Sequence, residues 1–120
     1  AADFGDKTAG GAYASGITSN AVRGVATATA YGTNSDVIEF ITIATLGNAT
    51  DFGDLSQSRS ALSSTASSTR AVFSNGLNPG TLNTMDYVQI PTTGNAIDFG
   101  NSLDTIVAGV SISNGHGGLG

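Results

Sequence analysis

The chain has 120 residues with four basic and nine acidic side chains, and its formal net charge of −5 argues against nucleic-acid binding, which requires a basic surface. This length fits one domain. Glycine, serine, threonine and asparagine fill nearly half of the positions, which disfavours a helical bundle, and the many β-branched residues disfavour disorder. The absence of cysteine excludes disulfides and thiolate metal sites, and no apolar run is long enough for membrane insertion.

Short strands separated by turns are the predicted elements along the chain. In chain order, we expect a strand at 37–43, a strand or turn at 50–55, a candidate strand at 59–68, and strands at 70–73, 85–90 and 105–112. In the first of these, apolar residues fall on both sides of the alternating pattern, which predicts a strand covered on both faces. Ser-Asn-Gly at residues 74–76 should end the strand before it, and Asn-Pro-Gly at 78–80 marks a turn.

An internal repeat runs through the chain with a period of 47 to 48 residues. Its clearest landmark is the tripeptide Asp-Phe-Gly, which occurs at residues 3–5, 51–53 and 98–100. Three further landmarks keep the same spacing: residues 19–25 match 67–72, residues 36–43 match 83–90, and residues 47–50 match 94–97. Four landmarks at one spacing predict a chain built from equivalent units.

These units predict the architecture. About four short strands in each period are typical of the blade of a β-propeller. We therefore expect one all-β repeat domain over residues 1–120, with units at 1–47, 48–94 and a truncated 95–120. Because so few units cannot close a propeller, either the chain belongs to a longer repeat protein, or several copies assemble, or the units stack as a prism or solenoid. The apolar stretch 105–112 should then be buried against another chain or further repeats.

One period of the repeat resembles a known family. Its landmarks are Arg-Ala-Val-Phe at residues 70–73, Met-Asp-Tyr-Val-Gln-Ile at 85–90, Asn-Ala-Thr-Asp-Phe-Gly-Asp-Leu at 48–55 and Arg-Ser at 59–60. This order resembles the kelch-like repeats of tailed-phage virion and tail-fibre proteins, in particular those of cyanophages. The resemblance covers nearly the whole chain. Departures from it are Ser-Asn at 74–75 in place of two glycines, and a last copy with an inserted residue and no following arginine.

The resemblance implies a function. A member of this family is expected to be a non-enzymatic structural or adhesion domain of a virion, such as a tail fibre that attaches to the host, located in the extracellular particle. Its expected partners are other copies of itself in a homo-oligomer, other virion proteins and glycans of the host surface. No cofactor is expected. The alternative is a free oligomeric lectin of the propeller type, whereas a hydrolase is disfavoured because the sequence offers no catalytic set.

The Asp-Phe-Gly motif also occurs in protein kinases, where its aspartate binds magnesium. That interpretation fails because the tripeptide occurs three times in a short chain that lacks the glycine-rich loop and catalytic loop of a kinase. A structural role is expected instead: the phenylalanines should fill the core of each unit, and the glycines should supply positive φ angles. The residues concerned are Phe4, Phe52 and Phe99, and Gly5, Gly53 and Gly100.

Paired carboxylates recur next to this motif, at Asp51 and Asp54 and again at Asp3 and Asp6. A calcium ion needs roughly six to eight oxygen ligands, and no known calcium-binding pattern is present. We therefore expect these aspartates to accept hydrogen bonds from turn amides rather than to bind a cation.

A second recurring feature pairs acids with arginines. Glu39 and Asp86 occupy equivalent places on strands that are otherwise apolar, and a buried carboxylate requires a partner. Arg23, Arg59 and Arg70 fall at repeat landmarks, and arginine pairs well with carboxylates. We therefore expect one acid–arginine pair in each unit. Acid–base catalysis by these carboxylates is disfavoured, because catalytic residues rarely recur in every unit.

Three residues are candidates for contact with a ligand. Tyr31 and Asn34 lie in a loop rich in glycine, threonine and serine, and such loops suit the recognition of sugars or proteins. His116, the single histidine, lies in the glycine-rich end, where a catalytic base would be held poorly. We expect it to make a contact at a tip or an interface.

Overall fold

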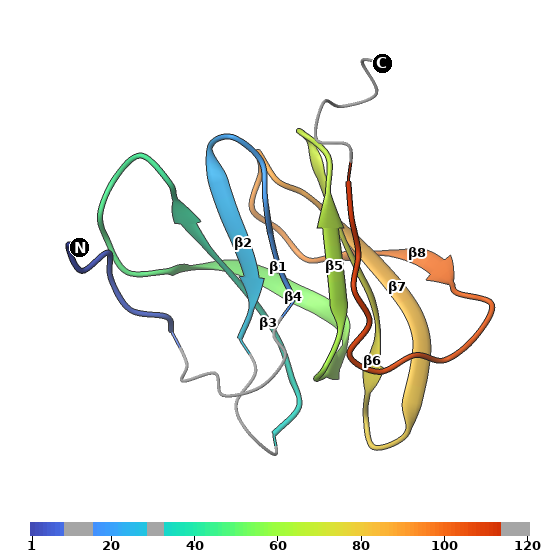
Figure 1. Cartoon of the computed structure of the whole chain (residues 1–120). Helices are drawn as coiled ribbons and strands as arrows, with labels where there is room; N and C mark the ends of the chain where they lie inside the picture. The colour runs from blue at the N-terminus through green and yellow to red at the C-terminus, as the bar shows by residue number, and fades with distance from the viewer. Residues whose placement is uncertain (9–15, 29–32, 114–120) are drawn as a thin grey trace.

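The structure, a computed structural model, describes residues 1–8, 16–28 and 33–113 (Figure 1). Within these residues the chain forms eight strands and no helix. The strands are β1 (Ile17–Ser19), β2 (Arg23–Thr27), β3 (Ser35–Thr42), β4 (Thr50–Arg59), β5 (Ser63–Ala66), β6 (Arg70–Leu77), β7 (Thr81–Gln89) and β8 (Ile97–Asn101). The expectation of an all-β chain is confirmed.

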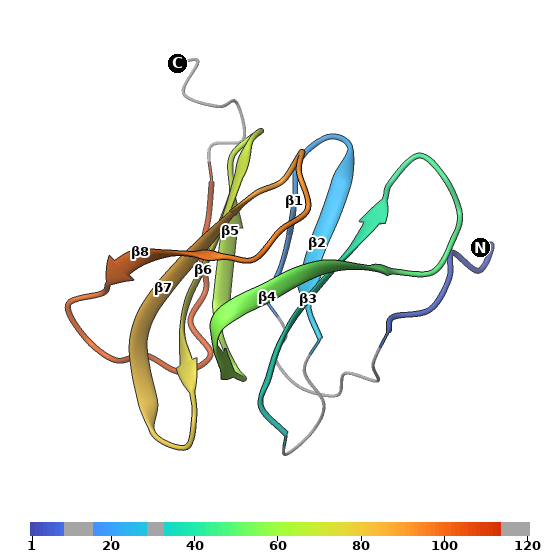
Figure 2. The same ribbon diagram turned by 180° about the vertical axis from the view of Figure 1, so that it is seen from behind.

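The strands form two antiparallel sheets of four, each a simple meander. Sheet 1 has the order β1-β2-β3-β4, and sheet 2 has the order β5-β6-β7-β8. Figures 1 and 2 show the two sheets next to each other from opposite sides, with β1 close to β5. Strand β4 runs on from sheet 1 toward sheet 2, where Ser60 forms a bridge with Leu77. The β4 strand therefore connects the two sheets through hydrogen bonds as well as through the chain.

The two sheets repeat each other at an offset of 47 residues. Val25 pairs with Phe40 in sheet 1. Val72 pairs with Tyr87 in sheet 2, at the corresponding positions of β6 and β7. Each sheet joins three strands of one sequence unit to one strand of the next, because β4 and β8 begin just after the Gly-Asn-Ala turns at 47–49 and 94–96.

The strands β1, β2 and β8 were not predicted, β7 begins earlier than the predicted 85, and two further predicted stretches differ in the structure. The strand that begins at Arg70 does not end at 74–76 but continues to Leu77, because Asn75 and Gly76 adopt φ angles of 63° and 115° and form a bulge that bends the strand. The stretch 105–112 is not a strand. It lies beside β5, where the Thr65 hydroxyl donates to the Ile112 carbonyl at 3.0 Å. That it is buried by another chain stays a prediction.

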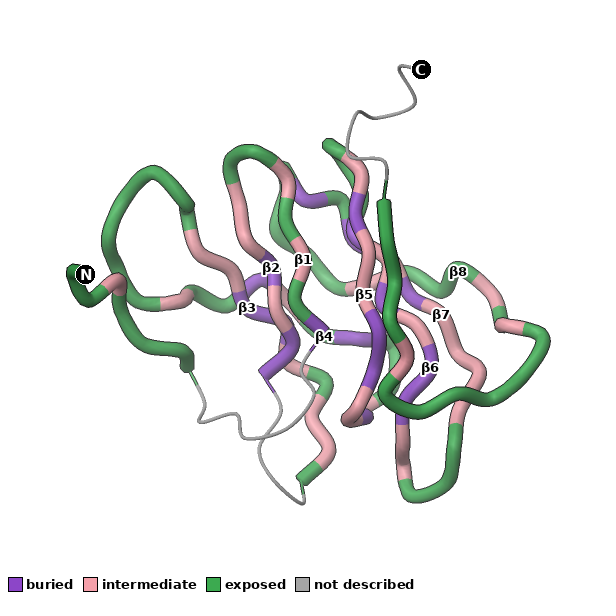
Figure 3. Tube along the Cα trace, in the orientation of Figure 1, coloured by how far each residue is buried: buried purple, intermediate pink, exposed green. Residues whose placement is uncertain are grey.

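One apolar core lies between the two sheets (Figure 3). Sheet 1 contributes Val25, Ile38, Phe52 and Leu55, and sheet 2 contributes Ala71, Phe73 and Val88. Because side chains alternate along a strand, each sheet also has a second face that turns away from this core. We call these the outer face of sheet 1 (Ile17, Gly24, Ala26, Glu39, Ile41) and the free face of sheet 2 (Arg70, Val72, Tyr87, Phe99).

Candidate functional site

The junction between units is built by main-chain bonds of the Asp-Phe-Gly motif. The amide of Gly94 donates to the Phe52 carbonyl at 2.8 Å, and the amide of Ala96 donates to the Asp54 carbonyl at 2.7 Å. The Asn95 side chain completes the set by accepting from the Asp54 amide at 3.1 Å. The motif of one unit thus holds the Gly-Asn-Ala turn of the next.

The same three bonds occur one period earlier. Residues 4–6 contact the turn at 47–49 through Gly47 N to Phe4 O at 2.9 Å, Ala49 N to Asp6 O at 2.8 Å, and Asp6 N to Asn48 Oδ1 at 2.9 Å. Asn48 and Asn95 were not predicted as partners of the motif. Their equal spacing from it was the signal that could have identified them.

The glycine of the motif is required by a close approach. Gly53 has a φ of 148°, and a Cβ atom there would collide with the carbonyl of Gly94. Gly5 has a φ of 142°, and a Cβ atom there would collide with the carbonyl of Gly47. Gly100 has a φ of 122°, but a Cβ atom there would meet no other atom within 4 Å. All three glycines therefore have the expected positive φ. At Gly100, no turn of the described residues packs against the motif, unlike at Gly5 and Gly53.

Asp86 and Arg59 form the expected acid–arginine pair at the centre of this junction. Arg59 donates to Asp86 Oδ2 at 2.9 Å, and neither side chain is exposed to solvent. Ser56 adds two bonds to the same carboxylate, from its hydroxyl at 2.6 Å and its amide at 3.0 Å. A second nitrogen of Arg59 donates to the Phe73 carbonyl at 3.3 Å. The pair is fully desolvated, and its hydrogen bonds replace the lost water at every polar atom except the buried Nε of Arg59, which has no partner among the described residues.

Glu39, the equivalent of Asp86 in sheet 1, has a different cation. Its Oε1 lies 3.2 Å from the ammonium of Lys7, and its Oε2 accepts from the hydroxyl and amide of Thr8 at 2.5 and 2.8 Å. The expectation that Glu39 pairs with an arginine is therefore wrong. Residues 4–8 lie against the outer face of sheet 1 as 52–56 lie against sheet 2, and they carry lysine near this site. Thr8 and Ser56 were not predicted, although they share the repeat spacing.

Among the described residues, the other two arginines have no acidic partner either. The guanidinium of Arg23 lies 4.6 Å from the ring centre of Phe40, and that of Arg70 lies 4.4 Å from the ring centre of Tyr87. Arg23 also donates to the Ile90 carbonyl of sheet 2 at 2.9 Å. The prediction of an acid partner is wrong for both, because the ring on the neighbouring strand lies directly beside each arginine and favours a cation–π contact.

The motif phenylalanines occupy three different environments. Phe52 is 3% exposed and meets Phe40 edge to face at 5.8 Å between ring centres. Phe4 is half-buried. Phe99 makes the same edge-to-face contact with Tyr87 at 5.9 Å, but it is 48% exposed. The expectation that Phe99 fills a core is therefore wrong, because no further sheet covers the free face of sheet 2 in the part of the chain that the structure describes.

The other predicted site residues are less informative. Asn34 is half-buried just before β3. Tyr31 and His116 lie outside the described residues. Of the four paired aspartates, Asp3 accepts a turn bond as expected, from the Gly5 amide to its Oδ1 at 3.2 Å. Asp98 of the third motif accepts the equivalent bond from the Gly100 amide at 2.9 Å.

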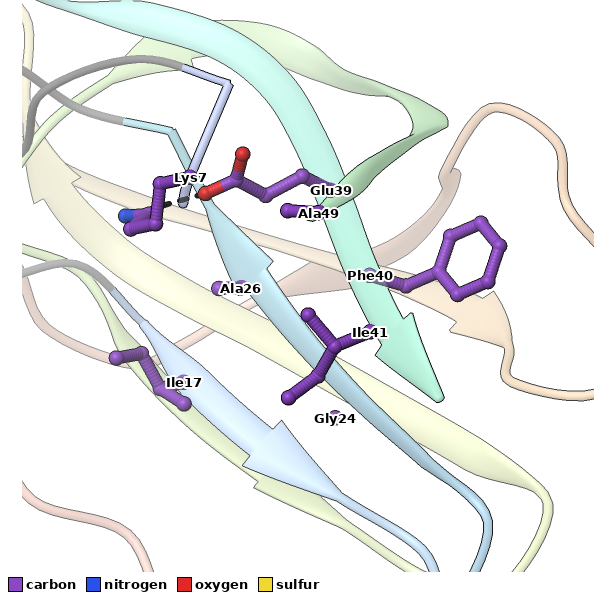
Figure 4. Close-up of a pocket in the computed structure, with 8 residues that line it drawn as sticks. All are labelled: Lys7, Ile17, Gly24, Ala26, Glu39, Phe40, Ile41 and Ala49. Atoms are coloured by element: carbon purple, nitrogen blue, oxygen red, sulfur yellow. Dashed lines mark ion pairs between the residues drawn. The ribbon is translucent and has the colours of Figure 1, made fainter. Parts of the chain in front are cut away.

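A pocket of about 180 Å³ lies on the outer face of sheet 1 (Figure 4). Its floor is apolar, with Ile17 and Ile41 standing beside Gly24 and Ala26, and the Lys7–Glu39 ion pair closes one end. A shallower pocket of about 330 Å³ lies on the free face of sheet 2, between Arg70, Val72, Phe99 and the segment that ends at 113. Both hollows lie on sheet faces that have no second sheet against them among the described residues.

Among residues 1–8, 16–28 and 33–113, no three histidine, cysteine, aspartate or glutamate side chains gather in a way that could hold a metal ion. The same residues contain no helix that could cross a membrane. Comparison with protein-family models finds no match to this chain, and comparison with curated proteins finds none.

Proposed function

We propose that the chain is a non-enzymatic structural domain of a phage virion, in a tail fibre or another exposed protein that contacts the host surface or other virion proteins. The observation that supports a structural role is the repeated junction. Its carboxylates are used twice in a similar way, since Asp86 binds Ser56 of β4, which enters from sheet 1, and Glu39 binds Thr8 of the segment that precedes sheet 1. A recurring device of this kind joins units to one another.

We further propose that the two sheets are kelch-like propeller blades. Each is a four-stranded meander, and the first strands of the two sheets lie close together, where Ser64 donates to the Ile17 carbonyl at 2.9 Å. Sheets that radiate from adjacent first strands are the arrangement of a propeller, whose blades surround a central channel. The apolar core between the faces supports the same proposal.

The proposal is tested on virus particles from the source of this sequence. Gold-labelled antibodies raised against the chain should label intact particles in the electron microscope, and peptides of the chain should be found by mass spectrometry of purified particles. Detection of the chain in the soluble fraction of infected cells and not on particles would refute it. A glycan array probed with the free chain distinguishes the lectin alternative, which requires binding without the particle.

A further inference from the structure

Two sheet faces resemble the two faces that pack together between the sheets, but no sheet packs on them among the described residues. Inside the chain, the face of sheet 1 with Val25 and Phe52 packs on the face of sheet 2 with Phe73 and Asp86. At an offset of 47 residues, the packed face of sheet 1 corresponds to the free face of sheet 2. At the same offset, the packed face of sheet 2 corresponds to the outer face of sheet 1. The two unoccupied faces are thus the same complementary pair as the two packed ones.

The free face of sheet 2 repeats the packed face of sheet 1 in detail. Arg70 lies over Tyr87, which meets Phe99 edge to face, and the distances and ring angles nearly match those of Arg23, Phe40 and Phe52. The two faces differ in burial, since Phe52 is 3% exposed and Phe99 is 48% exposed. The free face is therefore arranged for packing before anything packs on it.

The outer face of sheet 1 repeats the packed face of sheet 2 with smaller side chains. Gly24 and Ala26 stand where sheet 2 has Ala71 and Phe73, and this difference leaves the 180 Å³ apolar pocket above them. A carboxylate, Glu39, occupies the position of Asp86 at the end of the same face. The outer face therefore keeps the apolar floor and the acid of the packed one and adds a hollow.

We propose that the free face of sheet 2 binds the outer face of sheet 1 of a second copy of this chain, in the geometry of the sheet–sheet contact inside the chain. The inference rests on the proposed structural function and names its assembly surface. Because the two faces differ, the contact is head-to-tail, and each copy keeps one face available for a further copy. The expected product is a closed ring or a filament.

A polar contact sets the register of this docking. Arg23 reaches from sheet 1 to the Ile90 carbonyl at the end of β7. The equivalent of Arg23 is Arg70, whose guanidinium has no hydrogen bond or ion pair among the described residues. The equivalent of Ile90 is Ile43, which is 44% exposed. Arg70 of one copy should therefore donate to the Ile43 carbonyl of the next.

One of two equivalent segments, residues 1–6 of the second copy or β8 of the first, has to leave when the copies dock. Residues 4–6 of the second copy already hold its turn at 47–49, which is where residues 99–101 of the first copy would go. The charges favour the N-terminal segment of the second copy, because Lys7 neutralises Glu39 and Thr8 donates hydrogen bonds to it, whereas Asp104 would bring a second acid there. Strand β8 is exposed along most of its length and should be displaced from β7 by residues 1–6.

The segment 105–113 also has to move, because it lies beside β5 where β1 of the second copy would lie. It is held at Thr65 by a bond to the Ile112 carbonyl, as β1 is held at Ser64 by a bond to the Ile17 carbonyl. Val110 and Ile112 are 98% and 94% exposed, so release of residues 110–112 exposes little new apolar surface. Ile106 and Val107 are 49% and 37% exposed, and main-chain bonds join this part of the segment to Gly76 and Ala61.

Cysteine cross-linking tests the register, because the natural chain has no cysteine. Val22 and Pro91 line one small pocket where the two sheets meet at their edge. Their equivalents in the docked pair are Thr69 of one copy and Ala44 of the next, both exposed. A mixture of Thr69→Cys and Ala44→Cys chains should form a disulfide-linked heterodimer under mild oxidation. A mixture of Thr69→Cys and Thr92→Cys chains is the matched control and should not.

Hydrogen exchange tests which strand is displaced. Raising the concentration of the unmodified chain should slow amide exchange in residues 1–6 and accelerate it in residues 97–104. The opposite pattern, or a monomer mass by light scattering without the specific heterodimer, overturns the proposal. Val72→Asp, on the free face, should abolish the cross-link while circular dichroism shows an unchanged fold. Labelled particles without the cross-link would refute the docking alone, and the cross-link without particle labelling would refute the virion function alone.

Discussion

At the scale of single residues, equivalent positions in the repeat have unequal energetic roles, because burial differs between them. Phe52 and Phe99 share a motif and an edge-to-face partner, yet one lies in the core and the other is about half exposed. Asp86 and Glu39 share a strand position, yet one meets a buried guanidinium and the other a partly exposed ammonium. Stability measurements can separate each pair.

Phe52→Ala should lower the free energy of unfolding by about 3–5 kcal/mol, because it removes a buried ring from the shared core. Phe99→Ala should cost about 1 kcal/mol or less in the monomer, because half of that ring already contacts water. Urea denaturation of both variants measures the difference. Equal losses would show that the free face of sheet 2 is covered in solution.

Asp86→Ala should destabilise the chain by about 3–5 kcal/mol, because it leaves the guanidinium of Arg59 buried without its charge partner. Asp54→Ala is the control, since the carboxylate of Asp54 is exposed and its contribution to the junction comes from the main chain. We expect the control to change stability by less than about 1 kcal/mol. Similar small effects at both positions would contradict the role assigned to the Arg59–Asp86 pair.

At the scale of elements, β4 forms hydrogen bonds on both of its edges. It pairs with β3 in sheet 1 from Thr50 to Arg59, while the carbonyls of Phe52 and Asp54 bind the turn at 94–96 and Ser56 binds the carboxylate of Asp86 in sheet 2. Gly53 lies between the two residues that bind the turn and lets the backbone of Gly94 approach closely. A strand of this design ties neighbouring sheets together, so damage to it should affect both.

Gly53→Ala and Gly100→Ala form a matched pair for testing this junction. Both glycines have positive φ, so both substitutions strain the backbone, by about 1–2 kcal/mol. Gly53→Ala adds a collision with the Gly94 carbonyl, whereas a Cβ at Gly100 meets no neighbour. Thermal unfolding should therefore show a clearly larger loss for Gly53→Ala. Equal losses would mean that the motif of β4 does not hold the turn at 94–96.

At the scale of the whole molecule, the two sheets share one core and should unfold together. The core cluster contains Val25 and Ile38 from sheet 1 and Phe73 and Val88 from sheet 2, and neither sheet has a core of its own among the described residues. The buried Arg59–Asp86 pair crosses between them as well. A unit whose apolar face is packed only by its neighbour lacks independent stability.

Single-tryptophan variants report on this cooperativity, because the natural chain has no tryptophan. Phe40→Trp places a fluorophore in sheet 1, and Tyr87→Trp places one in sheet 2. The two fluorescence transitions in urea should coincide with each other and with the loss of circular dichroism. A first transition in one sheet that leaves the other folded would show that the sheets are independent.

The all-β class, the period and the positions of the motif could be predicted from the amino-acid sequence, because strand alternation and repetition are local or periodic properties. That Asp86 pairs with an arginine could be predicted as well, since a carboxylate on an apolar strand needs a cation and three arginines fall at the landmarks. That the partner is Arg59 and not Arg70 was decided by the tertiary structure. The short strands β1 and β2 gave too weak an alternation to be recognised.

What each repeated residue meets depends on the tertiary structure. Glu39 forms an ion pair with Lys7, and Arg23 and Arg70 form cation–π contacts with aromatic rings. These partners are brought together by the pairing of strands and not by proximity in the sequence. Phe52 is buried and Phe99 is exposed because a sheet packs on one and none of the described residues form a sheet on the other. Periodicity makes positions equivalent in conformation, but burial depends on the neighbour that packs there, which is a property of the assembled sheets.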